Sequence, residues 1–331
     1  MKHIVFITTG GTIASSHSEE GLVPTLDSKQ IYTLIGQGFD SITVDMIDLM
    51  SIDSSNMQPE EWQIIAAEIK KHIGHCDGIV LTHGTDTMAY TASVLSFILQ
   101  NIPIPIVITG SQLPIQHPLS DGIENIRVAF TMAMQPHPGI FVAFNRKVLL
   151  GTRAVKVRTM GFDAFDSINQ AIVANVDARG LQINEAVLHQ SAGSFQYLPN
   201  LCTDVFLVKL TPGFNPEIFD LLIQQNYKGI VVEAFGAGGM SFIRRDLTSK
   251  LQEVAKQGIS VVVCSQCLYD GSNFSIYQTG KKVLQEGIIQ GYDMTSEAAV
   301  TKLMWALGNY DTPALIQACF MKDIAGEITL P

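Results

Sequence analysis

Three short segments of the sequence combine hydroxyl groups, carboxylates and glycines at a spacing that permits chemistry. In residues 8–13, paired glycines let the backbone turn sharply and bring amide groups and a threonine hydroxyl close to a ligand. Residues 49–57 contain the run Asp-Ser-Ser-Asn, and residues 82–87 read Thr-His-Gly-Thr-Asp-Thr. Because a hydroxyl is a good nucleophile only beside a base, these segments are candidates for one site if the fold brings them together.

Each segment also has a structural or alternative explanation. Threonine and aspartate next to a helix start act as N-caps, and for Asp86 the spacing alone favours capping. The same explanation applies to residues 49–57, and His83 is predicted to be a packed, hydrogen-bonded histidine rather than a base. For residues 8–13 the alternative is a phosphate-binding loop, but the sequence has no Gly-x-x-x-x-Gly-Lys-Ser/Thr and no complete Gly-x-Gly-x-x-Gly.

Short apolar runs alternate with amphipathic helices around these segments. Strands are predicted over residues 4–8, 78–82, 105–109, 139–144, 205–210, 229–234 and 259–264. Helices are predicted over residues 59–73, from Asn215-Pro216 through Leu222, and from an Asp246 cap to Gly258. The alternation predicts an α/β fold with two domains, each an open, mainly parallel sheet flanked by helices. In such sheets ligands bind beyond the carboxyl ends of the strands, where residues 8–13 and 82–87 lie.

A polar stretch divides the chain. Residues 189–203 are mostly small or polar and contain a proline, as domain linkers do. We therefore predict an N-terminal domain over residues 1–188, a linker over residues 189–203 and a C-terminal α/β domain over residues 204–331. The composition, 47% hydrophobic and 16% charged over 331 residues, is typical of a globular protein and excludes a disordered chain.

The net charge and the N-terminal sequence limit which partners the protein binds and where in the cell it is located. With 21 Lys and Arg against 31 Asp and Glu, the net charge of −10 disfavours binding to nucleic acid. No apolar run reaches the length of about 18 residues that a membrane-spanning helix needs, so no membrane association is expected. The N-terminus enters a strand without a secretory signal, and five scattered cysteines predict no disulfide framework. These observations predict a cytoplasmic protein.

The ordered set of motifs resembles the bacterial-type L-asparaginases, and most of all their cytosolic, type I branch. The motifs are Thr-Gly-Gly-Thr-Ile at residues 9–13, Asp-Ser-Ser-Asn-Met at residues 53–57 and His-Gly-Thr-Asp-Thr-Met at residues 83–88. The likeness continues through residues 107–112, 151–156, 161–165 and 301–303, so it covers nearly the whole chain. It implies an asparaginase/glutaminase-like fold with a flavodoxin-like, catalytic N-terminal domain and a C-terminal domain that completes the active site and the oligomer interface. It also implies hydrolysis of L-asparagine to L-aspartate and ammonia, without a metal or an organic cofactor.

The resemblance assigns catalytic roles to four residues. Thr12 is implied to be the nucleophile that forms an acyl-enzyme, while Thr85, Lys156 and Asp86 accept its proton and compensate the charge that develops. A lysine can act as a base where burial disfavours its charged form and lowers its pKa. For Lys156 the structural alternative is a solvated surface lysine.

The resemblance also assigns the substrate-binding residues. Asparagine carries an α-ammonium and an α-carboxylate, so its site needs a fixed anion and several donors. Asp86 is implied to bind the ammonium, beside Thr85. Ser54 and Ser55 are implied to hold the α-carboxylate and amino group, and Asp53, which begins their motif, is included with them. Ser111 is expected where a backbone carbonyl meets the leaving amide.

Two positions depart from the pattern of the family. In a predicted lid over residues 14–25, many relatives have a tyrosine whose hydroxyl reaches the nucleophile, whereas this chain has Leu22. Either Thr85 and Lys156 serve the nucleophile with water, or a tyrosine elsewhere, Tyr269 or Tyr277, supplies the hydroxyl.

The second departure concerns regulation. Some cytosolic relatives bind an effector asparagine through an arginine at the position that Glu233 occupies here, and a neighbouring polar position is Val155. A carboxylate cannot pair with the α-carboxylate of an effector. We therefore expect that effector pocket to be absent or rebuilt.

Two other functions remain as alternatives. One is the related tRNA-dependent amidotransferase subunit, which usually carries an additional N-terminal module, whereas the Thr12 motif of this chain begins at once. The other is a non-catalytic module that binds asparagine, which would not need the four implied catalytic residues. In the leading interpretation the chain is a homodimer or homotetramer whose partner is the small molecule L-asparagine.

Overall fold

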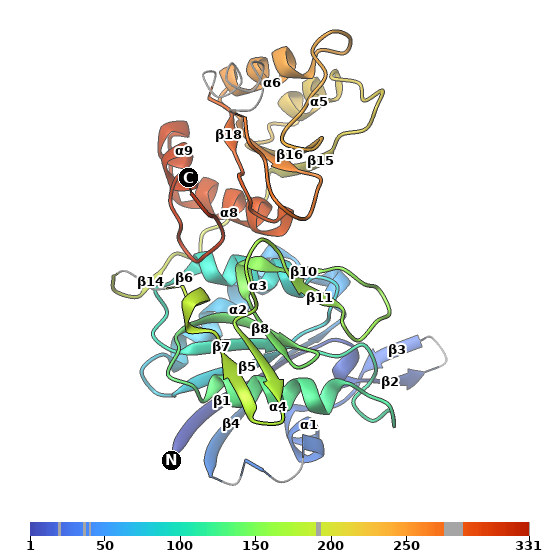
Figure 1. Ribbon diagram of the computed structural model, residues 1–331, viewed down its shortest axis with the longest axis vertical. Helices are drawn as coiled ribbons and strands as arrows, with labels where there is room; N and C mark the ends of the chain where they lie inside the picture. The colour runs from blue at the N-terminus through green and yellow to red at the C-terminus, as the bar shows by residue number, and fades with distance from the viewer. Residues whose placement is uncertain (19–20, 36–37, 40, 190–192, 275–286, 331) are drawn as a thin grey trace. The chain divides into compact units, whose positions relative to one another are not determined.

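The computed structural model describes residues 1–18, 21–35, 38–39, 41–189, 193–274 and 287–330. The chain forms two compact units, Met1–Pro199 and Asn200–Pro331 (Figure 1). Each unit is built on an open sheet flanked by helices, so the predicted α/β fold class is confirmed. The exact division into two domains and a linker stays a prediction.

The first unit contains an eight-stranded sheet in the order β13-β12-β9-β8-β7-β5-β1-β4. Its strands are β1 (Lys2–Gly10), β4 (Ile42–Ile52), β5 (Gly78–Thr82), β7 (Pro105–Thr109), β8 (Gly139–Phe144), β9 (Lys147–Leu150), β12 (Ala174–Asp177) and β13 (Gly180–Ile183). The strands from β8 to β4 are parallel, and in chain order they lie 2-1-3-4-5, which is the flavodoxin-like arrangement. The antiparallel extension through β9, β12 and β13 was not predicted.

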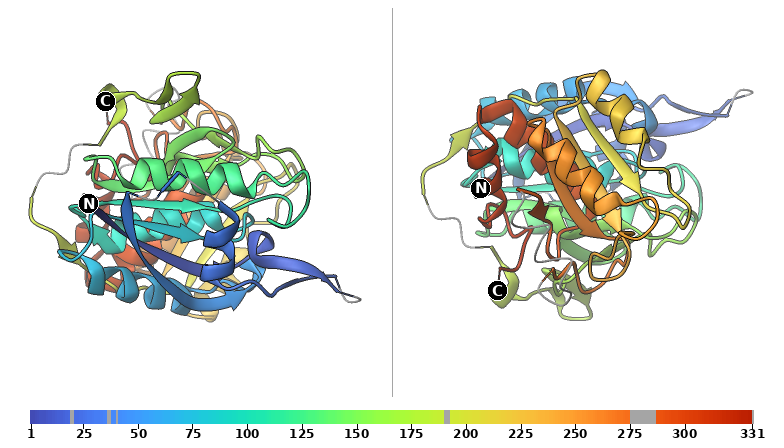
Figure 2. Two further views of the ribbon diagram at one scale, coloured as in Figure 1. Left: turned by 90° about the horizontal axis from the view of Figure 1, so that it is seen from below. Right: turned by 90° about the horizontal axis from the view of Figure 1, so that it is seen from above.

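Helices cover both faces of this sheet (Figure 1; Figure 2, left). They are α1 (Ser28–Ile35), α2 (Pro59–His72), α3 (Met88–Ile98) and α4 (Gly122–Ala133). On the face covered by α1 and α4, the ring of Phe130 packs at 5.5 Å from that of Phe6 and 5.3 Å from that of Phe39. On the other face, α2 is joined to α3 where Trp62 Nε1 donates to Thr91 Oγ1 at 2.9 Å.

Shorter elements connect these layers. The strands among them are β2 (Ser15–Ser18), β3 (Gly21–Pro24), β6 (Leu99–Gln100), β10 (Ala154–Lys156), β11 (Phe165–Ser167) and β14 (Gln196–Tyr197), and the 3-10 turns are Thr12–Ala14, Ser54–Asn56, Gly151–Arg153 and Glu185–Val187. Part of the predicted linker, residues 190–192, lies outside the described residues. Its later part forms β14, which pairs with β6 in the first unit.

The second unit has a parallel sheet in the order β15-β16-β17-β18 (Figure 2, right). Its strands are β15 (Val205–Lys209), β16 (Gly229–Ala234), β17 (Ser260–Ser265) and β18 (Ile289–Gln290), and its helices are α5 (Ile218–Gln224), α6 (Leu247–Lys256), α8 (Ser296–Asn309) and α9 (Pro313–Phe320). The predicted cap of α6 is confirmed, because the Asp246 side chain accepts from the Ser249 backbone nitrogen at 2.9 Å. Helix α5 begins at Ile218 rather than at Pro216, because a turn precedes it.

A buried ion pair ties the C-terminal segment of the second unit to α8. Lys302 Nζ donates to the Glu327 carboxylate, and neither side chain is exposed to solvent. Lys302 Nζ also donates to the Lys322 carbonyl oxygen at 2.8 Å, and the same carboxylate accepts from the Ala325 backbone nitrogen at 2.7 Å. Within the described ranges, no helix has both the length and the apolar character needed to cross a membrane.

Candidate active site

The three segments identified in the sequence meet where the order of the parallel strands reverses. Strand β1 lies between β4 and β5, and Thr8 pairs with Asp48 on one side and with Thr82 on the other. The three segments follow the carboxyl ends of these strands, at the switch point where α/β sheets bind ligands.

Two glycines allow the segments to touch. A Cβ on Gly11 would lie 2.5 Å from the Gly84 nitrogen, and a Cβ on Gly84 would lie 2.5 Å from Ser54 Oγ. Gly11 also has a φ of 77°, which an L side chain rarely adopts. Its nitrogen donates to the Ile52 carbonyl oxygen at 2.9 Å, so the loop after β1 is fixed to the end of β4.

Thr12 begins the turn that follows these glycines. Its side chain is half-buried, and it does not cap the turn, because the N-cap position is Gly11. Ser15 Oγ and the Ala14 nitrogen both donate to the Gly11 carbonyl oxygen, at 2.9 and 3.1 Å, and hold the turn in place. The hydroxyl of Thr12 is therefore carried by a fixed backbone at the switch point.

Lys156 joins two of the other residues implied by the resemblance. Its Nζ donates to Thr85 Oγ1 at 2.8 Å and to Asp86 Oδ1 at 2.6 Å. The Lys156 side chain is 18% exposed and that of Asp86 is 64% exposed. The interpretation of Lys156 as a solvated surface lysine is therefore wrong.

The capping interpretation is also wrong for Asp86. The N-cap of α3 is Thr87 and makes no side-chain capping bond, while the Asp86 carboxylate pairs with Lys156. Ser54 fixes this segment from the neighbouring loop. Its Oγ accepts from the Asp86 nitrogen at 3.3 Å, and its carbonyl oxygen accepts from Thr87 Oγ1 at 2.8 Å.

Lys156 reaches the site from a different part of the chain. It ends β10, which pairs with β11 so that Lys156 lies opposite Phe165. Phe165 is buried and packs at 5.1 Å from the ring of Phe144. The short hairpin is thereby anchored in the core of the first unit, which holds the lysine at the carboxyl end of the sheet.

Asp53 and Ser55 have a structural role in the second segment. The Asp53 carboxylate accepts from the Ser55 nitrogen at 2.8 Å and from Ser55 Oγ at 2.5 Å, so Asp53 caps the 3-10 turn. The hydrogen bonds from the Ser55 side chain and backbone lower the pKa of Asp53. Both residues are exposed, and their predicted role in substrate binding stays a prediction.

His83 is a structural histidine, as predicted. It is fully buried, and its Nδ1 lies 2.7 Å from the Gly84 carbonyl oxygen, which can only accept. Its Nε2, 2.9 Å from Thr91 Oγ1, then accepts a hydrogen bond while Thr91 in turn accepts from Trp62. Every polar atom is satisfied with a neutral ring, and burial lowers the pKa of His83 to about 4.

Ser111 lies in the loop after β7. The side chain of Asp121 holds this loop, and the sequence did not indicate that role. Ser111 is buried, and its Oγ donates to the Leu113 carbonyl oxygen. The carboxylate of Asp121 accepts from the Gln112 nitrogen at 3.0 Å and from the Leu113 nitrogen at 3.2 Å. Burial raises the pKa of Asp121, while these hydrogen bonds oppose that shift. The available signal was the 107–112 motif, which marked the loop but not the residues that hold it.

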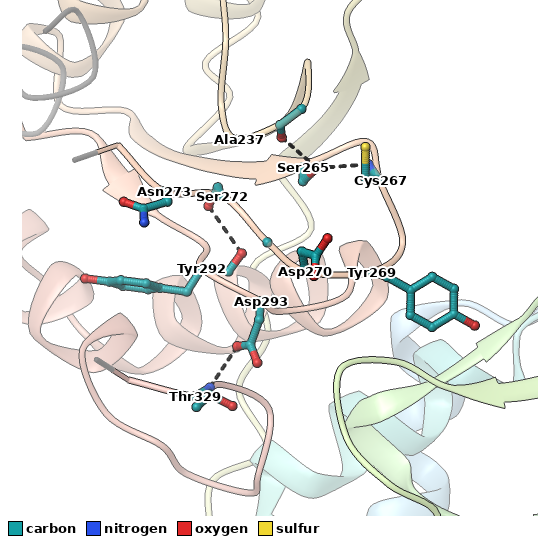
Figure 3. A pocket seen from close by; sticks show the side chains of 12 residues that line it. Ala237, Ser265, Cys267, Tyr269, Asp270, Ser272, Asn273, Tyr292, Asp293 and Thr329 are labelled. Carbon is teal, nitrogen blue, oxygen red and sulfur yellow. Dashed lines mark hydrogen bonds between the residues drawn. The ribbon is translucent and has the colours of Figure 1, made fainter. Parts of the chain in front are cut away.

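Tyr269 and Tyr277, the two tyrosines predicted to replace the missing lid tyrosine, stay predictions. The backbone of the predicted lid forms the β2–β3 hairpin, but the side chain of Leu22 lies outside the described part. Tyr277 also lies outside the described residues. Tyr269 belongs to the second unit, is 53% exposed and lines a hollow of about 530 Å³ there. Figure 3 shows its ring directed away from Asp293 and Thr329 on the other side of that hollow.

Glu233, at the predicted effector position, is engaged within its own unit. Ser296 Oγ donates to Glu233 Oε1 at 2.6 Å, and Lys209 Nζ lies 3.6 Å from Glu233 Oε2. Val155 is buried on β10 of the first unit. The absence or rebuilding of the effector pocket stays a prediction.

The fold and the site together define a class of protein. It has two α/β units, and the first presents a threonine hydroxyl and a hydroxyl–lysine–carboxylate chain at its switch point. Within the described residues, no group of three or more His, Cys, Asp and Glu side chains is placed to hold a metal ion.

Comparisons with known proteins identify the family within this class. The family model "Asparaginase, N-terminal" matches residues 3–189, and "Glutaminase/Asparaginase C-terminal domain" matches residues 204–320. The L-asparaginase of Thermococcus kodakarensis is 41% identical over 98% of this chain and 99% of its own length. Its solved structure superposes with a TM-score of 0.92, covering 99% of this chain and all of the other. The chain therefore belongs to the asparaginase family.

Two further relatives bear on the alternatives. L-asparaginase 1 of Escherichia coli K12 is 33% identical, over 99% of this chain and 98% of its own length. A glutamyl-tRNA(Gln) amidotransferase subunit of Methanosphaera stadtmanae is 32% identical, over 99% of this chain and 77% of its own length. The resemblance to the L-asparaginases that the motifs indicate is confirmed.

Proposed function

We propose that the protein hydrolyses L-asparagine to L-aspartate and ammonia with Thr12 as the nucleophile. The observation that carries the proposal is the position of Lys156, whose Nζ bonds both the Thr85 hydroxyl and the Asp86 carboxylate at the edge where Thr12 lies. A hydroxyl, a lysine amine and a carboxylate in contact can accept a proton in sequence, which a threonine nucleophile requires. Membership of the asparaginase family supports the same reaction.

The proposed reaction has two halves. In the first, Thr12 Oγ1 attacks the side-chain amide carbon of asparagine and gives its proton to Thr85 Oγ1, whose own proton passes to the neutral amine of Lys156. The carbon–nitrogen bond then breaks, the leaving nitrogen takes a proton from the same pair, and ammonia departs from an aspartyl ester of Thr12. In the second half, water attacks the ester under the same base, which releases aspartate and restores the Thr12 hydroxyl.

The substrate contacts follow from the charges of asparagine. Asp86 uses one oxygen for Lys156 and exposes most of its side chain, so its carboxylate is available for the α-ammonium. Ser54 and Ser55 lie in one loop beside it and are proposed to bind the α-carboxylate and amino group. Asp53, whose carboxylate accepts from Ser55, is proposed to belong to the same substrate-binding loop. Ser111 is proposed to lie near the leaving amide.

One assay separates this function from its two alternatives. The purified protein alone is given L-asparagine, and ammonia and aspartate are measured together. We expect equal amounts of both products. If both appear only after an amidotransferase partner subunit and misacylated tRNA are added, the chain is the amidotransferase subunit. If asparagine binds in calorimetry but no ammonia forms, the chain is a binding module.

We also propose a cytoplasmic location and assembly as a homodimer or homotetramer. All five cysteines are free thiols, which suits a reducing compartment. In the assembly, the second unit is proposed to complete the active site and form the oligomer interface. Cell fractionation tests the location, and sedimentation equilibrium of the purified chain distinguishes the two oligomers from a monomer.

A further inference from the structure

We propose that Gln112 is a positioning residue that orients the Thr85 hydroxyl and holds the loop after Lys156. The inference deepens the proposed function and rests on it. Gln112 follows Ser111 in the loop after β7 and is half-buried. Its side-chain amide contacts both the segment of Thr85 and the loop of residues 157–161, and so joins two parts of the proposed relay.

The hydrogen bonds fix which way the amide points. Gln112 Nε2 donates to the Thr159 and Gly161 carbonyl oxygens, each at 3.0 Å. Carbonyl oxygens can only accept, so the nitrogen of the amide must face them and Gln112 Oε1 must face Thr85. Because Oε1 is an acceptor, Thr85 Oγ1 donates to it, at 3.4 Å.

This orientation determines the direction of the proton on Thr85. Lys156 donates to Thr85 Oγ1 at 2.8 Å, so that oxygen accepts from the ammonium and directs its own hydrogen to Gln112. Without Gln112 the hydroxyl can rotate and lose its alignment with the lysine. Gln112 thus holds the Thr85 oxygen against Lys156 in the resting state. For the proposed transfer, the Thr85 hydrogen turns from Gln112 to the neutral amine of Lys156 while Thr85 Oγ1 takes the proton of Thr12.

The backbone of Gln112 is itself held firmly. Its nitrogen lies 3.0 and 3.1 Å from the two carboxylate oxygens of Asp121. Asp121 is joined to Asn125, whose Nδ2 donates to one carboxylate oxygen at 2.9 Å and to the Gly110 carbonyl oxygen at 3.0 Å. By contrast, Thr159 and Met160 are exposed. Gln112 therefore connects Asp121, at the start of α4, to the exposed loop that begins three residues after Lys156.

Two substitutions separate its contacts. Gln112→Met keeps the length of the side chain and removes both the acceptor and the donor. Gln112→Glu keeps an acceptor for Thr85 but loses the donor to the two carbonyl oxygens, and it adds a negative charge two hydrogen bonds from Lys156. Gln63→Met is the matched control, because Gln63 Nε2 also donates to a carbonyl oxygen, that of Pro199 at 2.8 Å, outside the site.

We expect Gln112→Met to lower kcat by about tenfold, with KM changed by less than about threefold, because alignment rather than binding is lost. Gln112→Glu should move the acid limb of the kcat–pH profile about one unit to higher pH, since an added carboxylate next to the proposed relay disfavours the loss of a proton there. Gln112→Met should not move that limb by charge, and Gln63→Met should leave both kcat and the profile unchanged.

Either of two results overturns the inference: kcat of Gln112→Met within about twofold of wild type, or an acid limb that Gln112→Glu leaves in place. If the wild-type protein releases no ammonia from asparagine, the proposed function fails first. The inference then depends on a crystal structure of Gln112→Met. Unchanged positions of residues 159–161 and an unchanged Lys156–Thr85 contact in that structure would overturn it independently.

Discussion

Two lysine–carboxylate pairs, one from each unit of the molecule, differ in what surrounds them. In the second unit, Lys302 and Glu327 are both fully buried, and their remaining polar atoms are bonded to backbone groups. In the first unit, Lys156 is 18% exposed and Asp86 is 64% exposed, and the lysine also bonds the Thr85 hydroxyl. We call Lys302–Glu327 the sealed pair and Lys156–Asp86 the open pair. The sealed pair can only stabilise the fold, whereas the open pair lies next to a hydroxyl and can exchange a proton.

The comparison shows why residue type alone does not indicate a role. A buried ion pair costs much of its attraction in desolvation and becomes strongly destabilising once a partner is removed. A pair with one largely exposed partner, like Asp86 in the first unit, contributes less to stability. Activity should therefore depend on the pair in the first unit, and stability on the pair in the second.

The largest expected effect is that of Thr12→Ala, which removes the proposed nucleophile beside the open pair. We expect kcat to fall by about a thousandfold or more, because the acyl-enzyme cannot form. Ammonia release measures the effect, and circular dichroism checks the fold. Thr131→Ala on α4, where the hydroxyl bonds only the Arg127 carbonyl oxygen at 2.7 Å, is the control. Activity of Thr12→Ala near that of wild type would exclude Thr12 as the nucleophile.

Lys156→Met tests the open pair directly. We expect kcat to fall by about 100-fold to 10,000-fold, the usual contribution of a proton-transfer group. Stability should change by only about 1 kcal/mol or less, because Asp86 is largely exposed. The losses in Lys156→Met and Thr85→Ala should combine non-additively, since both residues act in one relay. A loss below about tenfold, or losses that multiply, would contradict the relay. Lys147→Met is the control.

Lys302→Met tests the sealed pair. It leaves the Glu327 carboxylate buried without a cation, so we expect the second unit to lose about 3–5 kcal/mol of its free energy of unfolding. Trp305 reports this unit in urea titrations, provided that Trp62 of the first unit is replaced by Phe. The double variant Lys302→Met/Glu327→Leu should regain most of the loss.

The control for the sealed pair is Lys322→Met, because only the backbone carbonyl of Lys322 bonds Lys302. We expect this variant to keep the stability of wild type. A Lys302→Met protein that also remains as stable as wild type would show that the buried pair contributes nothing.

The buried, neutral His83 should make the free energy of unfolding depend on pH, and this effect is smaller than those above. Its folded pKa of about 4 lies below the ordinary value of 6.5, so the unfolded chain binds a proton that the folded chain does not. Stability from this group is fully present above about pH 6.5 and is lost as pH falls toward 4. Between pH 7 and 5 the loss should be about 2 kcal/mol. His83→Gln should flatten this slope in urea titrations, and an equal slope in both proteins would contradict the buried neutral ring.

The smallest effect is expected for Leu22→Ala in the predicted lid. If Leu22 closes the site only by excluding water, kcat and KM should each change by about two- to fivefold. Steady-state kinetics with asparagine measures both constants, and circular dichroism checks the fold. Damage as large as that in Thr12→Ala would mean that the lid contributes more than the exclusion of water.

Local patterns in the sequence were sufficient for much of the fold. Strands β5, β7, β8 and β16 begin and end where the apolar runs predict, and α2 begins at Pro59. These elements are determined by the period of buried residues and by residues at their own ends. The antiparallel strands β9, β12 and β13 were missed because each is only four residues long, and β12 and β13 are also partly exposed.

By itself, the sequence determined which residues could perform the chemistry. The order of its motifs indicated the family, and the strand–helix alternation placed residues 8–13 and 82–87 beyond the carboxyl ends of strands. It could not decide between a cap and an ion pair for Asp86, or between a surface lysine and a base for Lys156, because both residues lie in local contexts that suit either role.

Only the tertiary structure showed which groups Lys156 and Asp86 contact. Lys156 bonds residues 70 and 71 positions away in the chain, and Gln112 bridges Thr85 to a loop 47 residues further on. Contacts over such separations arise when the packed sheet brings the ends of its strands together, and no local propensity encodes them. The physical reason is that a hydrogen bond needs its two atoms within about 3 Å of each other, which the core fixes only after the chain has folded.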